Sequence, residues 1–117
     1  MKTTTAAMTH MQINRQGVYL FHLGRPFKHA QHYIGWSQYI PRRIWHQRQG
    51  SGSRFCAAAV GLGIKLKLVR VWTAEGENTR TFERRLKNQK NARRLCPICR
   101  KEDRKRRWSL NRERRHS

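Results

Sequence analysis

Residues 17–37 read GVYLFHLGRPFKHAQHYIGWS, and this stretch decides the fold. Two runs rich in aromatic and branched residues, 18–22 and 32–37, flank a Gly-Arg-Pro turn sequence at 24–26. Aromatic and branched side chains favour extended backbone because they pack well on a pleated surface. The stretch therefore predicts a hairpin of two strands.

The segments after the hairpin alternate between helix and strand patterns. Residues 39–49 carry isoleucines four apart, with a proline in the first turn and Gly50 as a stop, and they predict a helix. An alanine-rich run at 55–62 predicts a second helix, and 65–72 alternates leucine with lysine as a third strand would. A further helix is predicted over 79–88. The pattern indicates a small α/β domain, with a three-stranded β-sheet flanked by α-helices.

The two ends of the chain differ in composition from its middle. Residues 1–15 are polar and threonine-rich, which predicts a flexible lead-in. The stretch 100–117 is dominated by arginine, so a basic disordered tail is predicted. The folded domain is expected over 16–99, and one domain is what 117 residues with 37% hydrophobic residues can support.

The charge of the chain points to its partner. With 27 Lys and Arg against 6 Asp and Glu, the net charge of +21 would oppose compaction unless a polyanion neutralises part of it. Nucleic acid is the expected partner. The longest apolar run, 56–62, is far short of the ~20 residues that cross a bilayer. Three cysteines are too few for a disulfide framework, so a cytoplasmic protein without membrane contact is expected.

Two tripeptides in the hairpin form a pattern with two later residues. Gly-Val-Tyr at 17–19 precedes Tyr-Ile-Gly at 33–35, Arg43 follows on the first predicted helix, and Glu83 lies forty residues later on another. In this order the chain resembles the GIY-YIG nuclease family over most of its folded part. It is similar to small bacterial members that end in Cys-Pro-x-Cys, which is Cys-Pro-Ile-Cys at 96–99 here.

The resemblance implies a metal-dependent endonuclease that cuts the phosphodiester bond by in-line attack of water with one metal ion, Mg²⁺ or Mn²⁺. Glu83 would hold this ion, and Arg43 would neutralise the charge of the phosphorane-like transition state. Tyr19 would stand beside the attacking water, with Tyr33 helping to position it. DNA is a more natural expectation than RNA.

Proton transfer has several candidates. Where the family has a histidine four residues after the arginine, this chain has Gln47, and His46 lies one place earlier. A phenol with a pKa near 10 is a poor base, so the charge of Arg43 and the metal would have to favour a tyrosinate. Alternatively a histidine relays the proton: His29, His32 or, preferably, His46 on the arginine helix.

Two residue sets remain open on local sequence alone. Glu83 lies among arginines and lysines, where an acid is either an ion-pair partner or a metal ligand. Cys96 and Cys99 have the spacing of half a zinc knuckle, but no second half follows. We expect buried thiols that close the domain; the alternative is a zinc ion completed by Cys56 and one histidine, or shared across a dimer.

Basic residues of the hairpin, the helices and the tail are the expected contacts to nucleic acid. They are Lys28, Arg42, Arg48, Arg84, Arg104, Arg106 and Arg107. Such contacts follow phosphates with little reading of bases. The alternative function is therefore a non-catalytic basic nucleic-acid-binding protein, with or without a zinc knuckle.

Overall fold

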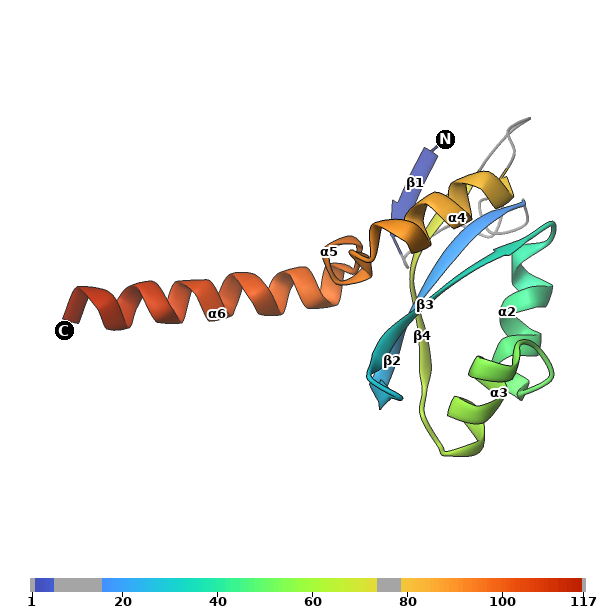
Figure 1. Ribbon diagram of the computed structural model, residues 1–117, viewed down its shortest axis with the longest axis horizontal. Helices are drawn as coiled ribbons and strands as arrows, with labels where there is room; N and C mark the ends of the chain where they lie inside the picture. The colour runs from blue at the N-terminus through green and yellow to red at the C-terminus, as the bar shows by residue number, and fades with distance from the viewer. Residues whose placement is uncertain (1, 6–15, 74–78, 117) are drawn as a thin grey trace.

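One antiparallel sheet organises the computed structural model, which describes residues 2–5, 16–73 and 79–116. Its strands are β1 (Lys2–Thr5), β2 (Gly17–Phe27), β3 (Ala30–Ser37) and β4 (Leu66–Thr73), in the spatial order β1-β4-β2-β3. The predicted sheet of three strands with flanking helices is confirmed by β2, β3 and β4 (Figure 1). Strand β1 extends it at the β4 edge, in a segment predicted to be flexible, and 6–15 lie outside the described residues.

The hairpin turns later than its sequence suggests. Strand β2 continues through 24–26, the predicted turn, and the chain reverses at Lys28 and His29. Both residues have positive φ, 48° and 69°, as the central pair of a type I′ turn requires to match the twist of the strands. Pro26 is accommodated because the pairing of β2 with β3 is irregular between His22 and Phe27.

The helices occupy the two sides of this sheet. They are α2 (Ile40–Gln49), α3 (Arg54–Gly61), α4 (Thr79–Gln89), α5 (Ala92–Leu95) and α6 (Pro97–His116). The ends of α2, α3 and α4 agree with the sequence-based expectation to within one residue. Gly50 ends α2 in the left-handed conformation, and the Ser53 side chain caps α3 by accepting from the Cys56 amide.

Strand β2 supplies side chains to two cores, because successive residues of a strand point to opposite faces. One set packs with α2 and α3 in what we call the first core: Tyr19, Phe21, Leu23, Ile40, Ile44, Cys56, Ala59, Ile64, Leu66 and Val71. The other set packs with α4, α5 and the start of α6 in the second core: Val18, Leu20, Ile34, Val69, Trp72, Leu86, Cys96 and Cys99. Figure 1 shows α2 and α3 on one side of the sheet.

The basic C-terminal segment is helical, and its predicted disorder is wrong. Helix α6 spans 20 residues and projects away from the sheet (Figure 1). Low apolar content suggested disorder, but arginine, lysine, glutamate and leucine are good helix formers, and Pro97 suits a first turn. Within the described residues, no helix combines the length and apolar character needed to span a membrane.

Candidate active site and metal centre

Helix α2 and the hairpin meet around a buried glutamine. Gln47 is fully buried, and its Nε2 donates to the Tyr19 hydroxyl at 2.9 Å and, more weakly, to the Tyr33 hydroxyl at 3.5 Å. Its Oε1 accepts from the Ser53 amide at 2.8 Å. Sequence reasoning left Gln47 out of the site. Its position on the buried face of α2, one turn after Arg43, could have identified it as a site residue.

Arg43 completes this cluster. It lies beside the hydroxyls of Tyr19 and Tyr33, close enough to interact with both electrostatically and by hydrogen bonding. Its Nε is buried and has no hydrogen-bond partner within the described part of the chain. A buried guanidinium N–H without an acceptor is costly, and a phosphate oxygen would satisfy it.

Two glycines of the motifs are required by close approach. A side chain at Gly35 would overlap the ring of Tyr19, its partner across the β2–β3 ladder. A side chain at Gly17 would overlap the Trp72 carbonyl on β4. Both glycines therefore have a steric role here: Gly35 leaves room for the buried Tyr19 ring, and Gly17 leaves room for the β4 backbone.

The environment of Tyr19 favours the neutral phenol. Burial raises its pKa to about 12, and the hydrogen bond from Gln47 and the nearby Arg43 offset this only in part. Tyr19 therefore keeps its proton at neutral pH, whereas the sequence-based expectation needed a tyrosinate. Its hydroxyl can accept one hydrogen bond and donate another.

A basic pocket of about 450 Å³ opens beside Arg43. Arg42, His46 and Arg80 also line it. The His46 Nδ1 lies 2.9 Å from Ser51 Oγ, and that hydroxyl donates to the His46 carbonyl at 3.3 Å. A hydroxyl has one proton to donate, so Oγ accepts from Nδ1–H, and the basic nitrogen of His46 is then Nε2.

A second polar cluster lies on the opposite face of the sheet. His22 and His32 are paired across β2 and β3, with ring centroids 5.3 Å apart. Their nitrogens meet two thiols of α6 and the residue before it: His22 Nδ1 is 3.4 Å from Cys96 Sγ and 3.6 Å from Cys99 Sγ. His32 Nε2 is 3.4 Å from Cys99 Sγ. One donor atom from each residue lies within 4.8 Å of all the others.

Burial sets the protonation of three of these side chains. It lowers the pKa of His22, and it lowers the pKa of His32 to about 4, so both imidazoles are neutral at neutral pH. Burial and the neighbouring Cys96 raise the pKa of Cys99 to about 11. Neutral imidazoles and cysteine sulfurs, which lose their protons on binding, are the donor set of zinc.

This cluster corrects the metal expectation. Mg²⁺ or Mn²⁺ held by Glu83 is wrong, because the described residues gather their metal-ligating groups in a buried Cys/His set and not around a carboxylate. Glu83 lies 3.8 Å from Lys87 Nζ, as an ion-pair partner would. The thiols are buried as predicted, but imidazoles accompany them. Cys56 belongs to the first core and so cannot complete the set.

Glu83 nevertheless lies near the hairpin. On α4 it occupies the same face as Arg80 and Lys87, three residues before and four residues after it. The Arg80 guanidinium lies 4.7 Å from the Trp36 ring centroid, and Lys87 Nζ lies 5.8 Å from that of Tyr33. Glu83 is therefore between two residues that cover β3.

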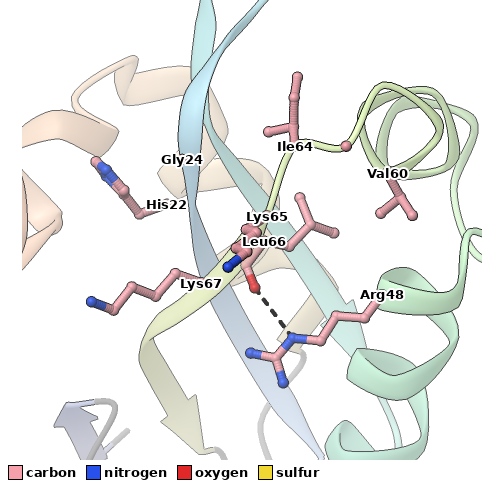
Figure 2. A pocket seen from close by; sticks show the side chains of 9 residues that line it. His22, Gly24, Arg48, Val60, Ile64, Lys65, Leu66 and Lys67 are labelled. Carbon is pink, nitrogen blue, oxygen red and sulfur yellow. Dashed lines mark hydrogen bonds between the residues drawn. The ribbon is translucent and has the colours of Figure 1, made fainter.

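The expected nucleic-acid contacts are spread over the molecule. Arg42 lies at the pocket of Arg43, Lys28 at the hairpin tip and Arg84 on α4. The arginines at 104, 106 and 107 are exposed along α6. Arg48 is held elsewhere: its Nε donates to the Leu66 carbonyl at 3.2 Å, beside a separate pocket of about 620 Å³ (Figure 2).

Figure 2 also shows His22 on the side of β2 opposite to Arg48, in keeping with its place in the metal-ligating set. His32 belongs to that set too and so is not at hand as a proton relay. His29 is exposed at the hairpin turn. Of the three histidines considered for proton transfer, His46 is the one beside Arg43.

Compared with protein-family models, curated proteins and solved structures, the chain gives no match. Its function is therefore argued from the two clusters and the charge.

Proposed function

We propose that the protein binds nucleic acid, DNA in preference to RNA, and hydrolyses its phosphodiester bonds at the pocket beside Arg43. The convergence of Arg43 with Tyr19 and Tyr33, next to a pocket that also has Arg42 and Arg80 in its wall, carries the proposal. The sequence resemblance to GIY-YIG nucleases supports it, since the same tyrosines and arginine are its motif residues. Three free thiols and a nucleic-acid substrate support a cytoplasmic location.

The proposed roles follow from charge and protonation. Arg43 binds the scissile phosphate through its planar fork, and it stabilises the charge that builds up on the phosphoryl oxygens. His46 takes a proton from the attacking water at Nε2, and the sugar oxygen leaves on the opposite side of phosphorus and takes up a proton from solvent. Tyr19, which is fully buried, remains neutral, and its hydroxyl, held by Gln47, positions Arg43 at the pocket.

Substitution of Arg43 tests the catalytic role. In single-turnover cleavage of linear, nicked and branched DNA and of RNA, Arg43→Ala should lower the rate about 100- to 1000-fold. Arg43→Lys should recover little, because a lysine cannot present two donors in a fixed plane. Assays with and without an added divalent cation make the outcome independent of any assumption about a metal.

Arg54→Ala is the matched control, since it removes the same charge from an exposed position on α3 outside the pocket. It should change the cleavage rate by no more than about twofold. Cleavage by Arg43→Ala at the parent rate would rule out the proposed site.

A second candidate function is binding without cleavage. It is favoured by Gln47, a buried neutral residue where the resembling family has a histidine. The same experiments separate the two. Tight, salt-dependent binding by the parent protein with no cleavage of any of the four substrates would establish the second function and contradict the first.

A further inference from the structure

Four ligating side chains converge from distant parts of the chain. His22 and His32 face the same side of the β2–β3 hairpin because they are direct partners in its register. Cys96 and Cys99 arrive more than sixty residues later, around Pro97 at the first turn of α6. Both thiols are fully buried.

The donor separations match those of a tetrahedral site. With zinc–sulfur bonds of about 2.3 Å and zinc–nitrogen bonds of about 2.0–2.1 Å, tetrahedral angles put nitrogen and sulfur about 3.5 Å apart. Three of the four sulfur–nitrogen distances in the cluster are 3.4, 3.6 and 3.4 Å, and the fourth is within 4.8 Å. Direct hydrogen bonding accounts less well for these distances, because the same His22 nitrogen is close to both sulfurs, at 3.4 and 3.6 Å.

Other uses of the two thiols fit less well. A redox pair needs an accessible thiol, and neither Cys96 nor Cys99 exposes any surface. Simple core packing would be served by aliphatic side chains, whereas imidazoles brought into a buried site lose their contact with water. Coordination gives all four donors a partner at once.

We propose that His22, His32, Cys96 and Cys99 bind one Zn²⁺ as a structural Cys₂His₂ centre. The centre links the first turn of α6 to the β2–β3 hairpin. On binding, two thiol protons go to solvent and two sulfur–zinc and two nitrogen–zinc bonds form. The two charges of zinc are balanced by the two thiolates, so a chain that already carries +21 gains no charge.

The other contacts near the first turn of α6 are weak, so a metal centre would add much to its attachment. Arg93 on α5 pairs with Asp103 on α6, with an Nη2–Oδ1 distance of 2.8 Å, but both side chains are partly exposed. Arg70 Nη1 donates to the Leu95 carbonyl at 3.2 Å. Besides these polar contacts, partly buried apolar side chains such as Leu95 and Ile98 pack the first turn of α6 against the second core. Coordination energy therefore adds directly to the folding energy of the second core.

Metal content and cobalt spectra test the centre without reference to nuclease activity. The full chain, purified without chelator and dialysed, should hold one zinc per chain. Replacement by Co²⁺ should give the visible bands of a tetrahedral site and a thiolate-to-cobalt charge-transfer band. Cys56→Ala is the matched control, because it removes an equally buried thiol from the first core, and it should keep the metal.

Loss of a ligand should lower Co²⁺ affinity by more than about 100-fold, exceeding the loss typical of a residue that only supports a ligand. Cys99→Ala tests this directly, and His32→Ala, whose side chain is only partly buried, keeps the test informative if Cys99→Ala does not fold. A strong chelator should lower the melting temperature of the parent and of Cys56→Ala but not that of His32→Ala. Fewer than about one zinc per ten folded parent chains, or an unchanged cobalt spectrum in His32→Ala, would overturn the proposal.

Discussion

The two faces of the sheet are closed by different means, although the same strand supplies both. Tyr19 and Phe21 face α2 and α3, which bring aliphatic and aromatic side chains. Leu20 and His22 face α4, α5 and the first turn of α6, and these helices are rich in arginine and lysine. Because so many residues of these helices are charged, the helices offer few apolar side chains to pack against the sheet. The second face is accordingly completed by imidazoles and thiols.

Substitutions of two adjacent residues of β2 test whether the two faces are stabilised independently. Phe21→Ala should cost about 3–5 kcal/mol of unfolding free energy and Leu20→Ala about 2–5 kcal/mol, since both side chains are fully buried. If the proposed zinc closes only the second face, a chelator should reduce the cost of Leu20→Ala and leave that of Phe21→Ala unchanged. Urea unfolding with and without chelator measures both costs. Equal responses of the two variants would contradict independent faces.

Gly35 tests how tightly the first face is packed. Gly35→Ala pushes a methyl group into the Tyr19 ring, so we expect a loss of about 1–3 kcal/mol and displacement of the Tyr19 hydroxyl from Gln47. Gly61→Ala is the control: it adds the same methyl at the end of α3, with no atom nearby, and should be neutral or stabilising by up to ~1 kcal/mol. Urea unfolding compares them, and equal effects would argue against the close approach.

The smallest effect is expected at the Arg93–Asp103 pair on the second face. Asp103→Asn should lower the melting temperature only slightly, because the pair is partly exposed. The hydrogen bond from Arg93 lowers the pKa of Asp103 below 3.8, so its contribution is present above that pH and is lost as the pH falls below it. Glu113→Gln, farther along α6, is the control. A difference between Asp103→Asn and parent that persists at pH 2 would contradict the ionic origin.

Local patterns predicted most of the fold and part of the site. The hairpin strands and three helices followed from periodicity, because each depends on nearby residues. The neighbourhood of Tyr19, Tyr33 and Arg43 was expected from the resemblance to the GIY-YIG family. The metal-ligating set did not, since no second ligand pair follows Cys96 and Cys99 in the sequence, and the alternative zinc site was expected to take Cys56 and one histidine or to be shared across a dimer. His22 and His32 become neighbours only through a strand register that a Lys-His turn sets, and that turn has no glycine or asparagine to mark it.

If nucleic acid binds at Arg43 as proposed, helix α6 has a consequence for the length of nucleic acid that the molecule would engage. Its nine arginines and lysines, a third of the 27 in the chain, lie along a rod of about 30 Å that does not fold back on the sheet. A disordered tail of the same composition would wrap any oligonucleotide held at Arg43. The rod would instead hold its charges at a set distance from Arg43, within a molecule 54 Å long. A duplex shorter than about 15 base pairs, at 3.4 Å each, would then be too short to run the full length of the molecule.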